Sequence, residues 1–218
     1  MPKVSYATVS SVKPDRLDDA IEVGRKAGKL IGRHGAEGRL LIADLAGEQT
    51  GLLVFTLQLD SIEKAASIVE ELDKDSEFRE FRTGLTSSAS PIVPLGASMS
   101  TEIPLPGKLP QGRGPVIEVH ITKPAPGRFD EAIKEAGKAG ALMAKAGAVN
   151  ILAFQMLYAG TQTGSIGLAV EWPSLKSQVL SGSVWATDPA GQALSAAMLN
   201  GKSATTLVSS ALYREIPL

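Results

Sequence analysis

Hydrophobic and polar residues follow the same order twice along the chain. Residues 4–9, VSYATV, and residues 116–121, VIEVHI, alternate in the way that is typical of strands with two different faces. After each of them, apolar residues recur at helical spacing, as expected for a helix that packs one face on a sheet. These positions are Leu17, Ala20, Ile21, Gly24, Ala27, Gly28 and Ile31, and then Phe129, Ala132, Ile133, Ala136, Ala139, Gly140 and Met143. The pattern predicts a strand and a long helix at two places in the chain.

A direct overlay shows that this order is an internal repeat. Residues 15–36 and 127–148 agree at 10 of 22 positions without a gap, at an offset of 112. One inserted residue then changes the offset to 113, and the endings TEIPL (101–105) and REIPL (214–218) coincide. Each unit is predicted to contain a strand, a long helix, two strands, a broken helix and a strand. Ser61 and Ser174 are expected N-caps of the broken helices, and the breaks are expected near Asp75 and Asp188.

This order of elements defines the predicted fold class. A β-α-β-β-α-β unit is the ferredoxin-like arrangement, with its helices on one face of a four-stranded antiparallel sheet. We therefore predict an α+β protein of two tandem ferredoxin-like units. The first unit is expected at residues 1–105 and the second at 115–218, with a linker rich in proline and glycine at 106–114. The uncovered sheet faces are expected to pack on each other or, alternatively, on those of another chain.

Composition and charge narrow the class of protein. The chain has 218 residues, of which 44% are hydrophobic and 21% charged, which is typical of a globular protein. With 22 basic and 23 acidic residues interspersed, no sustained basic surface is available for nucleic acid. The sequence shows neither the apolar run of a signal peptide nor a stretch of the roughly 20 apolar residues that a membrane helix needs, so we expect a cytoplasmic protein with no membrane partner. The absence of cysteine excludes disulfides and thiolate nucleophiles.

Three segments carry a resemblance to a known superfamily: VEWPSLKSQ at 170–178, DSEFREF at 75–81 and DPAGQAL at 188–194. They are similar to the strand, Pro-Ser-Leu, helix and Asp-Pro pattern of NIPSNAP-like and antibiotic-biosynthesis-monooxygenase-like domains of the dimeric α/β-barrel superfamily. The resemblance implies that the two sheets close face to face into a barrel, with a small-molecule ligand as the expected partner. Most such domains pair as homodimers, and here the tandem units would supply both halves. Exposed strand edges would also support a homodimer of the whole chain.

Glu118 and His120 are the predicted catalytic pair. The alternation along residues 116–121 suggests that Ile117, Val119 and Ile121 face the helices, which would leave Glu118 and His120 on the side of the inter-sheet cavity. A carboxylate and an imidazole two residues apart on one strand face can share a proton and act as base or acid. The alternative is that both lie in a solvated, partly exposed groove or pair with basic neighbours.

The same alternation selects candidate ligand-binding residues. These are Tyr6, Thr8, Thr56, Gln58, Gln155, Glu171 and Tyr213. The face of Gln155 is ambiguous. Trp172 belongs to the helix-facing set of its strand, and the sequence therefore favours a place in the core.

Cofactors and activity are less constrained. Chlorite dismutase and the dye-decolourising peroxidases of this superfamily bind haem through a histidine, but His34 and His120 lack a matching context, so we predict no cofactor and no metal. His34 is instead expected to interact with a helix dipole. Three hypotheses remain: a cofactor-independent monooxygenase or isomerase acting on a small apolar metabolite, a ligand-binding protein without catalysis, and a structural or interaction protein. The sequence does not decide whether the protein is an enzyme.

Overall fold

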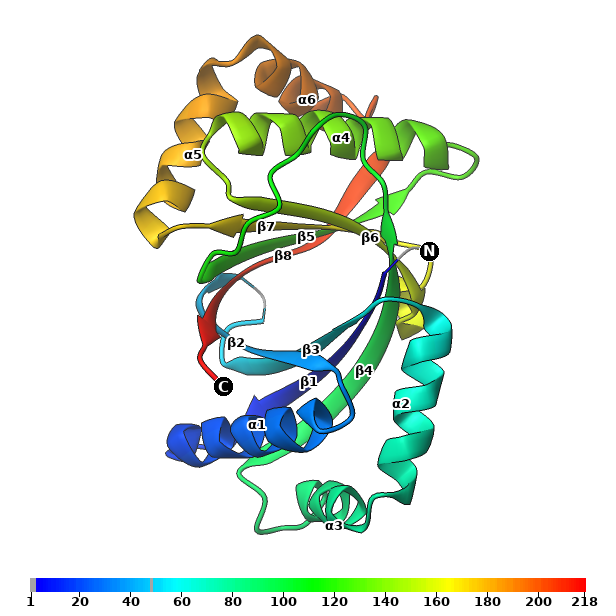
Figure 1. Ribbon diagram of the computed structural model, residues 1–218. Helices are drawn as coiled ribbons and strands as arrows, with labels where there is room; N and C mark the ends of the chain where they lie inside the picture. The colour runs from blue at the N-terminus through cyan, green and yellow to red at the C-terminus, as the bar shows by residue number, and fades with distance from the viewer. Residues whose placement is uncertain (1–2, 48) are drawn as a thin grey trace.

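The computed structural model describes residues 3–47 and 49–218 and contains the predicted order of elements twice (Figure 1). The first set consists of β1 (Val4–Val12), α1 (Leu17–Gly32), β2 (Glu37–Gly47), β3 (Leu52–Leu59), α2 (Ile62–Lys74), α3 (Ser76–Leu85) and β4 (Ile92–Ile103). The second consists of β5 (Val116–Pro124), α4 (Phe129–Lys145), β6 (Asn150–Tyr158), the short 3₁₀ helix η1 (Gly160–Gln162), β7 (Ile166–Trp172), α5 (Leu175–Thr187), α6 (Pro189–Leu199) and β8 (Thr205–Ile216).

The predicted helix boundaries are confirmed by their capping contacts. Ser61 and Ser174 each accept a hydrogen bond from the backbone N–H three residues later, at 3.2 and 3.1 Å. Asp75 separates α2 from α3, and its carboxylate accepts a hydrogen bond from the N–H of Glu77 at 2.8 Å. Asp188 separates α5 from α6 in the same way, because Pro189 cannot donate to the preceding turn.

The strands form one closed antiparallel barrel in the order β1-β3-β2-β8-β5-β7-β6-β4. Within each unit the order is ferredoxin-like, and the two sheets join where β2 pairs with β8 and β4 with β6. Helices α1 to α3 lie outside one half of the barrel and α4 to α6 outside the other (Figure 1). The predicted α+β fold of two ferredoxin-like units is confirmed, and both sheets come from one chain. No helix among residues 3–47 and 49–218 is long and apolar enough to cross a membrane.

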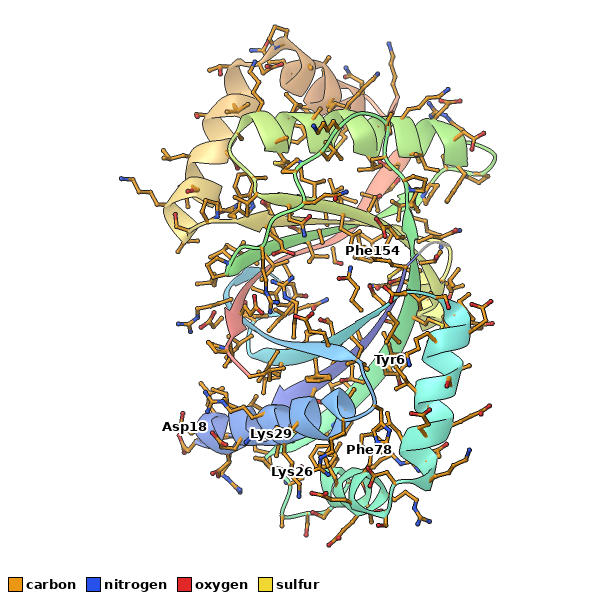
Figure 2. All side chains as sticks on the ribbon, viewed as in Figure 1. Tyr6, Asp18, Lys26, Lys29, Phe78 and Phe154 are labelled. Carbon is orange, nitrogen blue, oxygen red and sulfur yellow. The ribbon has the colours of Figure 1, made fainter. Side chains whose placement is uncertain are left out.

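Apolar side chains occupy much of the barrel interior. One buried cluster combines inward-facing residues of both units, namely Leu41, Ala43, Val54, Ile117, Ala211 and Tyr213. Gly167 on β7 leaves room for the ring of Phe154 on β6, since a Cβ atom at Gly167 would lie 2.2 Å from that ring. Figure 2 shows Phe154 between the two sheets. The missing side chain on β7 therefore accommodates the large side chain on β6 inside the barrel.

A network of charged side chains joins the two sheets at one end of the barrel. Arg39 on β2 donates hydrogen bonds to both carboxylate oxygens of Glu171 at 2.7 and 3.1 Å, and to Glu215 on β8 at 2.7 Å. Glu171 also accepts hydrogen bonds from Asn150 at 2.9 Å and from the N–H of Gly114 at 2.8 Å. This buried carboxylate therefore accepts four hydrogen bonds. A ligand could bind to Glu171 only in competition with these donors.

Arg113, between β4 and β5, extends the network to the surface. It donates to Glu215 and, at 2.8 Å, to Glu37. Burial raises the pKa of Glu215, but the hydrogen bonds from Arg113 and Arg39 outweigh burial and leave the pKa below its ordinary value. The segment before β5 is thereby fixed to both units.

Candidate functional site

A cavity of about 430 Å³ lies between the sheet of the second unit and its helices. This volume is within the range of small-molecule sites, roughly 300–1,000 Å³. The floor comes from β5, β7 and β8 and the walls from α4, α5 and α6. Most of its lining is apolar and includes Ala132, Ala136, Ala139, Met143, Ile166, Leu168, Val179, Trp185, Leu194, Met198 and Leu207. The candidate site is therefore outside the barrel and inside the second unit.

The internal repeat explains why the second unit is hollow at this place. At the offset of 113, Ile68 of the first unit corresponds to Ser181, and Phe78 corresponds to Gly191. In the first unit, Ile68 is 1% exposed and packs in one cluster with Phe78 and Tyr6, which Figure 2 shows on the helix side of that sheet. Smaller side chains on α5 and α6 leave this volume unfilled in the second unit.

Glu118 and His120 stand side by side at the cavity. His120 Nε2 lies 2.9 Å from Glu118 Oε1, and Trp172 Nε1 donates to Glu118 Oε2 at 3.1 Å. The side chain of Glu118 is 13% exposed and that of His120 is 25% exposed. Trp172 is fully buried, as its helix-facing position predicted. The three side chains thus form a chain of hydrogen bonds from the core to the cavity.

The surroundings of Glu118 favour its ionised form. Burial raises the pKa of Glu118, but the hydrogen bond and the charge of His120, with further hydrogen bonds from Gln178 and Trp172, outweigh burial and lower the pKa below its ordinary value. An ionised carboxylate only accepts hydrogen bonds, so His120 carries its proton on Nε2 in this contact when the imidazole is neutral. Nδ1 is then unprotonated and available as a base.

Replacing Trp172 with Phe should weaken this arrangement. The variant removes the N–H that supports the Glu118 carboxylate, which should raise the pKa of Glu118 and cost about 2 kcal/mol of unfolding free energy at pH 7. A carboxylate with a lowered pKa stabilises the fold above its unfolded pKa, near 4.3, and this contribution is lost as the pH falls through the folded-state pKa. Urea unfolding should therefore show a difference between variant and wild type that narrows below about pH 4.

Trp185→Phe is the matched control, because the indole N–H of Trp185 donates to the sulfur of Met143, at 3.4 Å, and not to a carboxylate. Trp185→Phe should lower the unfolding free energy by less than Trp172→Phe does, and this loss should not depend on pH. An equal, pH-independent loss in both variants would contradict the proposed support of Glu118 by Trp172.

Glu135 on α4 supplies a second polar group at the cavity. It accepts hydrogen bonds from the hydroxyl of Ser203 at 2.7 Å and from the N–H of Ala204 at 2.9 Å. The sequence analysis did not select this residue. The signal was the overlay, in which the charged Glu135 corresponds to the apolar Val23 of the first helix. Its contacts fix the segment that leads into β8.

The predicted orientation of four strand residues is wrong. Glu118 and His120 face the helices, and Ile117 packs in the barrel interior instead. Tyr6 likewise packs under the helices of the first unit, and Thr8 shares its face of β1. The physical reason is that the apolar side chains of Ile117 and Val119 pack in the barrel interior. The polar side chains of β5 therefore face the cavity between the sheet and the helices. The pairing of Glu118 with His120 itself is confirmed.

The other candidate ligand-binding residues do not converge on one place. Thr56 and Gln58 share the inward face of Val54, as the alternation predicted. Gln155 shares the helix-side face of Ile151 and Ala153. Tyr213 is buried in the barrel, its hydroxyl donates to Gln49, and burial raises its pKa to about 12.

The lining residues do not fit haem. Haem carries two carboxylates that need positively charged partners. Among the described residues, no lysine or arginine lines this cavity, whereas two carboxylates, those of Glu118 and Glu135, do line it. His120, the histidine that lines the cavity, directs Nε2 at Glu118. His34 lies in the first unit, between Glu71 and Asp75, at 3.3 and 3.2 Å. In the described part of the chain, no group of three or more His, Asp or Glu side chains is arranged to hold a metal ion.

The chain has the dimeric α/β-barrel fold, built here from two ferredoxin-like units in tandem. No family model and no curated protein matches the sequence. Among solved structures, an anthrone oxidase-like protein superposes with a TM-score of 0.63 at 14% identity, covering 99% of this chain and 92% of the other.

Two further structures extend this comparison. A presumed monooxygenase from Fusobacterium nucleatum superposes with a TM-score of 0.60 at 9% identity, covering 99% of this chain and 93% of the other. A mutant chlorite dismutase from Candidatus Nitrospira defluvii gives a TM-score of 0.56 at 7% identity, covering 99% and 92%. At these identities the similarity shows the fold alone, and it confirms the barrel fold that the resemblance implied.

Proposed function

We propose that the cavity of the second unit binds a small, uncharged and largely apolar metabolite, and that Glu118 and His120 act on it as a base in a cofactor-independent oxygenase or isomerase. The observation that carries this proposal is the hydrogen-bonded carboxylate and imidazole at the wall of an otherwise apolar cavity. The two carboxylates and the absence of lysine and arginine from the described lining disfavour an anionic ligand. The names of the neighbouring monooxygenase-like structures agree with this class.

The chemistry follows from the two ring nitrogens of His120. Nδ1 takes a proton from a C–H group that a neighbouring carbonyl makes acidic, while Glu118 stabilises the resulting imidazolium through Nε2–H. In an isomerase, the proton returns to a different carbon of the ligand, and no other reactant is required. In an oxygenase, dioxygen is the oxidant: a CH₂ group becomes C=O, and the second oxygen atom leaves with the two hydrogens as water.

A binding protein without turnover is the second candidate. It is favoured by the hydrogen bonds that already occupy both oxygens of Glu118. In that case a ligand hydroxyl would donate to His120 Nδ1 and no proton would be transferred. Ligand binding is common to both candidates, so it is the property to test first.

Filling the cavity should abolish ligand binding. Ala139 lines the cavity, and Ala139→Phe should remove the volume that a ligand needs. A ligand at 100 times its Kd stabilises the native state by about 2.7 kcal/mol, which should raise the Tm of wild type by roughly 5–10 °C. Thermal unfolding against a panel of uncharged two- and three-ring phenols and ketones should show this shift in wild type and lose it in A139F.

Ala141→Phe is the matched control, since Ala141 is exposed on the same helix. It should keep the ligand response. Should Ala139→Phe fail to fold, Ala136→Leu adds less volume to the same wall. A ligand that stabilises A139F as much as wild type would bind elsewhere, and this result would overturn the proposed site.

A further inference from the structure

The first half of β8 extends beyond the part that β2 covers. β5 pairs with β8 over its whole length from Thr205 to Arg214, whereas β2 pairs only with residues 211–216. Within the described part of the chain, residues 205–210 therefore have no strand partner on their outer side. We refer to this segment as the β8 overhang. A strand edge of this kind presents a row of backbone N–H and C=O groups to which another strand can pair.

The first unit contains the same overhang with a protective residue. β6 pairs with β4 only from Met99 onward, so the preceding part of β4 is also an edge. Pro94 lies in this part, and proline lacks the N–H that a further strand would need. At the offset of 113, Leu207 replaces Pro94 and Val208 replaces Leu95. The β4 edge is therefore blocked and the β8 overhang is not.

Exposed apolar side chains surround the β8 overhang. Leu207 is 55% exposed and Val208 is 41% exposed, although β-branched and large apolar residues are typical of paired strands. Met198 on α6 is 51% exposed and, like Leu207, lines the cavity. Leu199, the next residue, is 87% exposed. Clustered exposed apolar groups mark an interaction surface.

We propose that the β8 overhang pairs antiparallel with the β8 overhang of a second copy about a twofold axis, so that one sheet continues across a homodimer. The segment, TTLVSS, carries no charge, so two identical copies meet without opposing like charges. Such a contact is closed and self-complementary. Pairing with the β4 edge of another copy would instead place Pro94 in the ladder.

The neighbouring helix supplies the remaining contact area. A stable interface buries roughly 1,200 Å² or more in total, which exceeds what a short strand pair provides. Met198 and Leu199 of both copies lie beside the overhang and add apolar area to the contact. This inference does not depend on the proposed activity, because it rests on the strand edge and on the exposed side chains around it.

Val208→Lys tests the interface. A lysine on an edge strand opposes edge-to-edge pairing, and two lysines about a twofold axis repel each other. Size-exclusion chromatography with light scattering should find wild type as a dimer at about 100 µM, and V208K as a monomer with an apparent Kd at least roughly 100-fold weaker. Hydrogen exchange should show that those amides of residues 206–209 that are not bonded to β5 are protected in wild type and lose this protection in V208K.

Leu95→Lys is the matched control, because it introduces the same charge at the equivalent, blocked edge of β4. This variant should stay dimeric. A monomeric wild type at 100 µM would overturn the proposal. So would a V208K protein that remains dimeric, or a dimer in which residues 206–209 exchange as fast as in V208K.

Discussion

Replacing Arg39 with Met is expected to lower the unfolding free energy by about 3 kcal/mol and the Tm by roughly 10 °C. Arg39 supplies two of the four hydrogen bonds to Glu171, whose side chain is 7% exposed, and it connects β2 to Glu215 on β8. Without Arg39, the carboxylates of Glu171 and Glu215 lose their shared positive partner where the two sheets of the barrel meet. Chemical unfolding at pH 7 with a single transition measures this loss.

The dependence on pH distinguishes charge from packing. Glu215 has a lowered pKa, so its contribution to stability is present above the unfolded pKa of about 4.3 and is lost as the pH falls through the folded-state value. The difference between Arg39→Met and wild type should therefore narrow in acid. The double variant R39M/E171Q should recover part of the loss, because it removes one unpaired charge.

An exposed ion pair provides the comparison. Arg33 lies 2.5 Å from Glu77, and both side chains are about half exposed, at 57% and 49%. Arg33→Met should change the stability by less than about 1 kcal/mol. If Arg39→Met lowered the unfolding free energy as little as Arg33→Met, the charged network would not stabilise the contact between the two sheets.

The fold was predictable because the repeat constrains it twice. The helical stripe from Leu17 to Ile31 and its copy from Phe129 to Met143 leave little choice of element, and the Asp75 and Asp188 breaks coincide in the overlay. A β-α-β-β-α-β unit has one uncovered sheet face, and two such units in one chain can cover each other. The closed barrel is therefore the direct consequence of having two copies.

The orientation of the site residues was not predictable from alternation alone. Period two separates Glu118 and His120 from Ile117 and Val119, but both faces of a barrel strand are covered, one by helices and one by the opposite wall. Apolar character therefore does not distinguish the faces. The register does: Glu118 pairs with Val170, and paired residues point to the same side. The sequence had already placed Trp172, which shares its face of β7 with Val170, under the helices, so the correct face required only the strand pairing.

Predicting the cavity from the sequence requires a comparison of the two units, because the alternation along single strands does not show it. Ser181 and Gly191 are unremarkable residues in isolation, and only their correspondence to Ile68 and Phe78 indicates missing volume. The same overlay identifies Glu135 and Gln178 as polar substitutions for Val23 and Ala65. The first unit, in which this space is filled by side chains, thus shows which volume is missing in the second unit.

Replacing Glu118 with Gln is expected to lower the kcat of the proposed reaction roughly 10²–10⁴-fold with little change in KM. The amide of Gln has no charge to stabilise a protonated His120, and its NH₂ group can donate to Nε2 and thereby move the ring proton to Nδ1, where the base is needed. Because the pKa of Glu118 is lowered, loss of its charge should reduce the wild-type rate only below the ordinary pKa of glutamate, about 4.3.

The double variant E118Q/H120A gives the sharpest test of this pair. Residues that act as one unit have non-additive effects, so the double variant should be no slower than H120A alone. Multiplicative losses would instead mean that Glu118 and His120 act separately. Unchanged turnover in both single variants, with ligand binding still abolished by A139F, would leave the cavity as a binding site and remove the acid–base role from the pair.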